Sequence, residues 1–112
     1  MKEDLKLEGI GLKVDSRIIV DSINTNNFNW QLDKTLEECV ELTNAIIHYK
    51  REEIANEQMC AEIGDLFVQI SILEHLFSRE MIQKCINRKL KSIDNRNKRI
   101  NDKPLKNVGF QP

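Results

Sequence analysis

The stretch WQLDKTLEECVELTNAIIHYKR, residues 30–51, decides the fold because its apolar residues return at the steps of a helix. Leucine, valine and isoleucine recur every three or four residues, which is the spacing of one helix face. The stretch contains neither glycine nor proline. We therefore predict a helix over about 31–51, with an apolar stripe at Leu32, Leu36, Cys39 or Val40, Thr43, and Ile46 or Ile47.

The chain on either side of this stretch is also poor in helix breakers. Gly64 is the only glycine or proline between residues 12 and 103, which favours further helices. We expect them over about 57–77 and about 80–99, with Ser78 as the N-cap of the last one. The stripe of the second long helix is predicted at Met59, Ile63, Leu66, Ile70 and Leu73. Such short connections favour antiparallel neighbours, so the fold class is predicted to be an all-α antiparallel helical bundle.

The two ends of the chain carry weaker patterns. Residues 15–25 are predicted to form a short helix, and the asparagine-rich residues 24–29 to form a loop, because asparagine competes for backbone hydrogen bonds. Residues 1–14 alternate in part, which fits a short strand pair or an extended arm. We expect one domain over 1–112, with an arm and short helix (1–27), a helical core (28–100) and a tail (101–112).

Composition narrows the classes of protein to which the chain could belong. The formal net charge of −1 favours neither nucleic acid nor a membrane surface as a partner, and we expect neither. No apolar run approaches the roughly 18 residues of a membrane span, and the start lacks the apolar segment of a signal peptide. Cys39, Cys60 and Cys85 form no CxxC pair, so we expect reduced core residues in a reducing, cytoplasmic compartment.

Acidic residues interrupt the apolar pattern of both long helices. Glu38 and Glu41 lie three residues apart in the first, and Glu62 and Asp65 lie three apart in the second. Residues at this spacing share a helix face, where like charges repel. If the helices pack antiparallel, the four carboxylates converge, and buried carboxylates do not all stay ionised without a positive partner.

A divalent cation would resolve this repulsion, and all-oxygen ligands favour Mg²⁺, with Mn²⁺ as a substitute, over zinc or copper. The alternative is that the acids are ordinary solvated helix faces. A di-iron site is a rival, but it needs Glu-x-x-His pairs. Ala45 and Ile72 stand three residues before His48 and His75, so we expect both histidines to be surface or boundary residues.

The pattern EECVE, followed after twenty residues by EIGD, resembles the signature of the MazG family of all-α nucleoside triphosphate pyrophosphohydrolases. That signature is EExxE, a spacer and ExxD. The segments WQLDKTLEECVELTNAIIHYKR and KCINRKLKSIDNR are similar to helices of small phage and bacterial members of the family. The resemblance covers about residues 28–99, and leaves out the first 27 residues and the tail after Asn101.

This resemblance implies a Mg²⁺-dependent enzyme that cuts a nucleoside triphosphate, by attack of an activated water, to the monophosphate and pyrophosphate. The family's metal ligands match Glu38, Glu41, Glu62 and Asp65. The candidate catalytic residues are Glu37, Glu38 and Glu41, and for Glu37 both support of a ligand and help in water activation stay open. The phosphate-contacting region of the family's last helix matches Lys89, and within a register open by one or two residues Lys91, Asn95 and Arg96.

The charge distribution fits such a site. Nine acidic residues stand against three basic ones over 33–65, and nine basic against two acidic over 84–106. Mg²⁺ would bridge the carboxylates and the polyanionic substrate, polarise the phosphoryl group and lower the pKa of bound water. Basic residues would offset the remaining charge, although the basic helix could equally be a solvated face or a nucleic-acid-binding end.

Aromatic and amide side chains near the acids are candidates for contact with the base and sugar. Trp30, with Phe28 beside it, precedes the acidic motif by one to two turns, although Trp30 could equally be a core anchor. Gln31 or Gln69 could read a base edge through hydrogen bonds. Gln69 lies four residues after Asp65, and therefore on the same helix face.

Apolar residues beyond the predicted stripe point to self-association. Burial against another copy is predicted for Phe67, Ile72, Leu76 and Phe77. The resemblance likewise implies a homodimer or homotetramer. Rival functions are a dUTPase-like specialist, the phosphoribosyl-ATP pyrophosphohydrolase of histidine synthesis, and a non-catalytic helical module for regulation or interaction.

Overall fold

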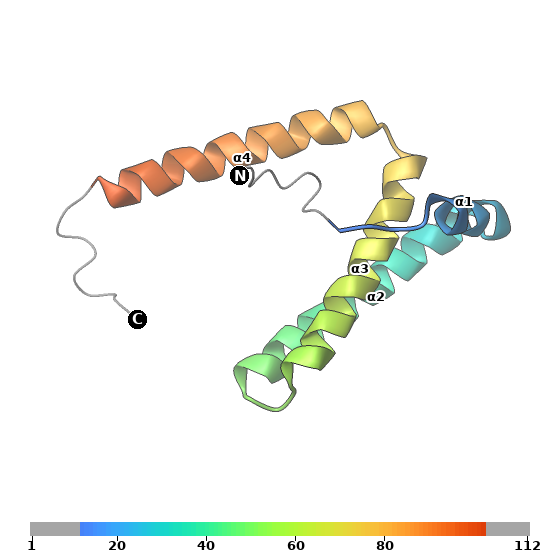
Figure 1. Ribbon diagram of the computed structural model, residues 1–112, viewed down its shortest axis with the longest axis horizontal. Coiled ribbons are helices and arrows are strands. Elements are labelled where there is room, and N and C mark those ends of the chain that lie inside the picture. Colours follow the sequence, from blue (N-terminus) through green and yellow to red (C-terminus); the bar gives the residue numbers. More distant parts are fainter. Residues whose placement is uncertain (1–11, 103–112) are drawn as a thin grey trace. The chain divides into compact units, whose positions relative to one another are not determined.

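A computed structural model describes residues 12–102, and every regular element in that range is a helix (Figure 1). In chain order they are α1 (Ser16–Thr25), α2 (Phe28–Lys50), α3 (Asn56–Leu76) and α4 (Arg79–Asn101). The prediction of an all-α fold is confirmed for this range. The strand pair or arm predicted for 1–14 and the tail predicted for 101–112 fall almost wholly outside it. None of the described helices combines the length and apolarity that a membrane span requires.

Short polar side chains fix where the helices begin. Asp15, Asn27 and Ser78 cap α1, α2 and α4, and each accepts a hydrogen bond from a first-turn N–H, at 2.9, 2.8 and 3.1 Å respectively. These bonds satisfy N–H groups that have no partner inside the helix. The N-cap predicted at Ser78 is therefore confirmed. At the start of α3 the Gln58 side chain accepts instead, from the backbone N–H of Ala55 at 2.8 Å.

The loop predicted over 24–29 is wrong in its extent. The helix α1 continues through Thr25 and α2 already begins at Phe28. The backbone N–H of Asn26 bonds to the Ser22 carbonyl at the end of α1, and the side chain of Asn27 caps α2. The local hydrogen bonds expected of asparagine are present, but the connection between the two helices consists of two residues, Asn26 and Asn27, instead of the six predicted.

A tight turn joins α2 to α3. Glu52 has a φ of 61°, and its N–H bonds to the carbonyl of Tyr49, while the N–H of Glu53 bonds to that of His48. This is the Schellman ending of a helix, in which glycine usually takes the left-handed position. The turn reverses the chain, so α2 and α3 run antiparallel, side by side (Figure 1). We call their contact the α2–α3 seam.

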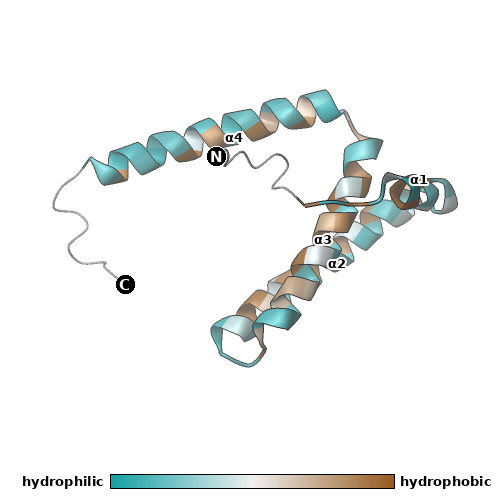
Figure 2. Cartoon of the chain, viewed as in Figure 1, coloured by the Kyte–Doolittle hydropathy of each residue, from teal (hydrophilic) through white to brown (hydrophobic). Residues whose placement is uncertain are grey.

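The chain divides into two units between Leu76 and Phe77. Among the described residues, the first unit contains α1, α2 and α3, and the second contains α4. The helix α4 buries none of its residues, and hydrophilic residues cover most of it (Figure 2). The extent of the predicted single domain stays a prediction.

The face that α2 packs against α3 is not the predicted apolar stripe. Gln31, Glu38 and Ala45 are the buried residues of α2, whereas Leu36 and Val40 are 65% and 57% exposed. The predicted stripe does share one helix face, but this face points away from α3. The buried face is polar, so hydrophobic periodicity alone selects the wrong side of the helix.

The helix α3 departs from prediction only in part, because Met59, Leu66 and Leu73 of its predicted stripe are half-buried. Ile63 and Ile70 of the predicted stripe are both 47% exposed, while Gln69, Ser71 and Ile72 are buried. Brown and teal residues accordingly alternate along both helices of the seam (Figure 2). Of the residues predicted to meet another copy, Ile72 is therefore wrong, because it already packs inside the first unit.

The cysteines are not core residues. Cys39, Cys60 and Cys85 are all free and exposed. Cys39 belongs to the outward stripe of α2, and α4, which carries Cys85, buries no residue. The prediction of buried cysteines is wrong because it assumed that the apolar stripes would be the packed faces.

Buried amides hold the three helices of the first unit together. The Gln31 side chain is fully buried, and its Nε2 donates to the carbonyl and the hydroxyl of Ser22 in α1, at 3.1 and 3.3 Å. The Nε2 of Gln69 in α3 donates to the backbone and side-chain oxygens of Gln31, at 3.2 and 2.9 Å. These contacts link α1, α2 and α3 through one residue.

We expect Gln31→Leu to destabilise the chain by about 1–3 kcal/mol, because it leaves the buried amide of Gln69 without an acceptor side chain. Urea unfolding measures the change. The double variant Gln31→Leu, Gln69→Leu removes both partners and should recover part of the loss. Single and double variants that both match the wild type would contradict a stabilising amide pair.

Candidate metal centre

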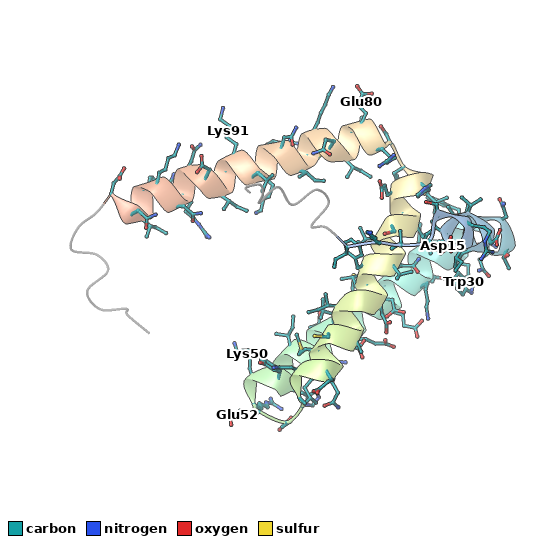
Figure 3. All side chains as sticks on the ribbon, viewed as in Figure 1. Asp15, Trp30, Lys50, Glu52, Glu80 and Lys91 are labelled. Atoms are coloured by element: carbon teal, nitrogen blue, oxygen red, sulfur yellow. The ribbon has the colours of Figure 1, made fainter. Side chains whose placement is uncertain are left out.

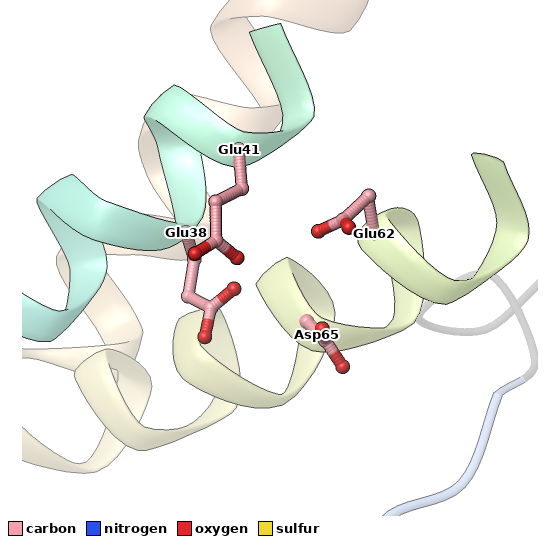
Figure 4. A group of neighbouring side chains, drawn as sticks. All are labelled: Glu38, Glu41, Glu62 and Asp65. Carbon is pink, nitrogen blue, oxygen red and sulfur yellow. The ribbon is translucent and has the colours of Figure 1, made fainter. Parts of the chain in front are cut away.

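Four carboxylates meet across the middle of the α2–α3 seam (Figure 4). Glu38 and Glu41 come from α2, and Glu62 and Asp65 from α3. Each contributes one carboxylate oxygen, and these four atoms all lie within 4.8 Å of one another. The structure thus brings together the four acids that the sequence predicted to converge, and together they could hold a metal ion.

Two of the acids carry buried oxygens with unmet bonding capacity. Glu38 is 8% exposed and Glu62 is half-buried. Within the described part of the chain, Oε1 of Glu38 and Oε1 of Glu62 are buried and have no hydrogen-bond partner. Native proteins rarely leave such atoms unpartnered, and each costs about 1–3 kcal/mol. A cation between the helices would supply the missing partner to both, so the residues fit an oxygen-ligated metal.

The acids of the cluster repel one another. Loss of hydrating water around its carboxylate, and then the charges of Glu38, Glu62 and Glu37, hold the pKa of Glu41 above its ordinary value. The shift arises although the Glu41 residue as a whole is exposed. Carboxylates that resist ionising in one another's presence are a common basis for cation binding.

Lys34 is the cation paired with this cluster, and sequence reasoning missed it. Its Nζ lies 3.4 Å from Oε1 of Glu37 and 3.5 Å from Oε2 of Glu38. The hydrogen bond and charge of Glu37, with Glu38 adding to them, raise the pKa of Lys34. The signal was present in the sequence, since Lys34 precedes the two glutamates by three and four residues, the spacing of helix neighbours.

Glu37 lies apart from the other motif acids. Its side chain is 55% exposed and pairs with Lys34, and it does not belong to the four-oxygen cluster. A role for Glu37 as a direct metal ligand therefore finds no support, and its role at the edge of the site stays a prediction.

An open cleft of about 360 Å³ adjoins the cluster on the side of the α2–α3 turn. Glu41 and Glu62 belong to both the cluster and the cleft. The other lining residues are Asn44, Ala45, His48, Ile54, Gln58 and Ala61. His48 is half exposed, as expected of a surface histidine, and its Nδ1 faces the Glu53 carboxylate. Sequence reasoning did not single out Asn44 or Gln58, because neither belongs to a motif.

The amide and aromatic candidates lie toward the other end of α2. Trp30 is 45% exposed and sits at the end of α2 opposite the turn that contains Glu52 (Figure 3). Gln31 and Gln69 bond to each other and are buried, so their amides are engaged within the fold. A contact between any of the three and a base stays a prediction.

The basic candidates all belong to α4. Lys89, Lys91, Asn95 and Arg96 are exposed on that helix, which lies in the second unit, and Lys91 is visible among its side chains in Figure 3. Their charge and exposure suit contact with an anion. Their assignment to the phosphates of a substrate stays a prediction.

Comparisons with family models, curated proteins and solved structures gave no match for this chain. The resemblance to the MazG signature therefore depends on the quoted motif residues alone. The function has to be argued from the site that those residues form.

We expect Mg²⁺ or Mn²⁺ to raise the melting temperature of the protein. A ligand at one hundred times its dissociation constant adds about 2.7 kcal/mol to the free energy of unfolding. Glu41→Gln should abolish most of this rise, measured by thermal unfolding with and without metal. Glu57→Gln, at an exposed glutamate of α3 outside the cluster, is the matched control and should keep it.

Glu41 also gives the metal-free chain a pH dependence. Because its folded pKa lies above the ordinary value of 4.5, its contribution to stability is fully present below about pH 4.5 and is lost as the pH rises through the folded pKa. Glu41→Gln removes that loss, so the metal-free variant should melt at a higher temperature than the wild type at pH 7. A lower melting temperature would contradict the repulsion that we infer.

Proposed function

We propose that this protein is a divalent-metal-dependent nucleotide pyrophosphohydrolase, which converts a nucleoside triphosphate or a related nucleotide to the monophosphate and pyrophosphate. The observation that carries the proposal is the meeting of four carboxylates with two buried, unpartnered oxygens. The motif in which they occur, EExxE followed by ExxD, resembles that of the MazG family. The geometry supports a cation site, and the motif supports the reaction.

Mg²⁺ is the metal that the site suits best. Its candidate ligands are the carboxylates of Glu38, Glu41, Glu62 and Asp65, which provide oxygen atoms only. Hard cations such as Mg²⁺ and Mn²⁺ prefer such ligands, and Mg²⁺ is commonly held by a few carboxylates together with substrate phosphates. When bound, the ion would offset part of the negative charge of the cluster, polarise the phosphoryl group and make water a better nucleophile.

The proposed reaction is a hydrolysis at the α-phosphorus. A water oxygen forms a bond to that phosphorus, the bond from it to the oxygen that bridges to the β-phosphate breaks, and pyrophosphate leaves. One proton is released. The chain would hold the reacting groups between α2 and α3, where Glu38 and Glu62 are shielded from solvent and a low local dielectric strengthens their attraction for a cation.

We expect the purified protein to release pyrophosphate from at least one member of a panel of canonical, deoxy and damaged nucleoside triphosphates with Mg²⁺. Glu41→Gln and Asp65→Asn should each lower kcat/KM at least about a hundredfold, since the ligands of one metal act as a unit. Glu57→Gln should retain activity. Phosphoribosyl-ATP and dUTP belong in the panel, because they report on the two specialist alternatives.

Activity that survives both substitutions would overturn the assignment of the metal ligands. Release of pyrophosphate from none of the nucleotides would instead favour a helical regulatory or interaction module. The thermal measurements with metal separate these two outcomes, because they test the cation site without any substrate.

The outward stripe of α2 supports assembly with a second copy. Leu36, Val40 and Ile47 lie on the side of α2 turned away from the seam and are 65%, 57% and 42% exposed. The described part of the first unit buries few apolar side chains, namely Ile19, Ala45 and Ile72. A contiguous apolar face on so small a core favours self-association, and a two-fold axis would bring the same face of both copies together.

We expect light scattering at micromolar concentrations to give at least twice the mass of one chain. Val40→Glu, which places a charge at the centre of the stripe and leaves the seam intact, should shift the protein toward the mass of one chain. Lys50→Glu at the end of the same helix is the control. A single-chain mass for the wild type would exclude the proposed assembly.

A further inference from the structure

Lys34 occupies one edge of the carboxylate cluster, one helical turn before Glu38. Its ammonium lies 3.4 Å from Glu37 and 3.5 Å from Glu38. We propose that Lys34 is a phosphate-binding group of this site, which pairs with the two glutamates in the empty protein and binds a polyphosphate oxygen when the substrate is present. This inference depends on the proposed function for the nature of the ligand, but it has a test of its own.

The two oxygens of Glu38 have different surroundings. Its Oε2 faces the ammonium of Lys34, while its Oε1 is buried without a hydrogen-bond partner. A cation held at Oε1 and the ammonium at Oε2 would therefore lie on either side of the same carboxylate. Two adjacent positive groups form the kind of site that a chain of phosphates, with oxygens on consecutive phosphorus atoms, can span.

The donors of Lys34 permit this second contact. An ammonium group has three N–H donors, and the contacts to Glu37 and Glu38 account for two of them. The side chain is 34% exposed, so it is partly accessible to a ligand in solvent. Both glutamate contacts are long for a hydrogen bond, at 3.4 and 3.5 Å, and such an ammonium can turn to a phosphate oxygen without leaving its carboxylates.

Lys34 supplies the positive charge that the surrounding carboxylates cannot supply to an anionic ligand. Five acidic side chains are gathered here, Glu37 with the four members of the cluster, and Lys34 is a basic residue that pairs with two of them. A divalent cation leaves this group negative, and a polyphosphate is itself an anion. Lys34 lowers the repulsion at the place where the phosphates would enter.

The test compares Lys34→Met with Lys50→Met. Methionine keeps an unbranched apolar side chain without the charge, and Lys50 is exposed at the far end of the same helix. Isothermal titration calorimetry measures binding of inorganic tripolyphosphate at saturating Mg²⁺. We expect Lys34→Met to weaken this binding about tenfold or more, the loss of a charged hydrogen bond, while Lys50→Met binds as the wild type does. Lys34→Arg, which keeps the charge, should retain most of the affinity.

A Mn²⁺ titration without phosphate shows whether the cluster itself is intact. Loss of a positive charge beside Glu38 should leave Mn²⁺ affinity unchanged or higher in Lys34→Met. Weaker tripolyphosphate binding with retained Mn²⁺ binding supports the proposal, because a damaged fold would weaken both. Tripolyphosphate binding equal to that of Lys50→Met overturns it.

The same experiment separates this inference from the proposed function. A wild type that binds tripolyphosphate through Lys34 but releases pyrophosphate from no nucleotide would support the phosphate site and overturn the proposed enzymatic activity. A wild type that hydrolyses nucleotides, with Lys34→Met unchanged in kcat and KM, would support the enzymatic activity and overturn the phosphate-binding role of Lys34.

Discussion

The structure depends on a polar α2–α3 seam, where a helical hairpin ordinarily packs leucine against leucine. At one end of the seam Gln31 and Gln69 are buried, and the amide of Gln69 donates to the side-chain oxygen of Gln31, whose own amide donates to Ser22. In its middle, Glu38 and Glu62 bury oxygens that nothing in the described chain satisfies. The buried amide pair needs no ligand to explain it, since both hydrogen-bonding partners are present. A cation could complete the second arrangement, and this contrast separates the candidate metal centre from the structural part of the seam.

A polar seam also determines where the apolar residues go. Because one face of α2 is given to glutamine, glutamate and alanine, several of its large apolar side chains, among them Leu36, Val40 and Ile47, are exposed. Hydrophobic burial within one chain is then small, and burial on a second chain becomes the means to add to it. The site and the assembly that we propose are thus two consequences of one distribution of side chains around α2.

Much of this fold could be predicted from the sequence. The scarcity of glycine and proline located the helices, serine chemistry placed the N-cap at Ser78, and three-residue spacing brought Glu38 and Glu41 opposite Glu62 and Asp65. Periodicity states which residues share a face but not which face meets the neighbour. For this reason the exposure of Leu36 and Ile63 and the burial of Gln31 were not predicted, and neither was the exposure of the cysteines.

Lys34 escaped prediction for a different reason. The EExxE and ExxD motifs are defined by acidic residues, and Lys34 lies outside them with the opposite charge. The role that we propose for it depends on the two oxygens of Glu38, one facing the ammonium and the other buried without a partner.

This distinction bears on how binding and folding are coupled. A cluster that raises the pKa of Glu41 stabilises the fold less when its acids are ionised, and a bound cation reverses that effect. Lys34 is a tethered cation that offsets part of the repulsion between Glu37 and Glu38. It therefore helps the chain to retain a strongly acidic seam, at which we propose that a metal ion and a phosphate bind.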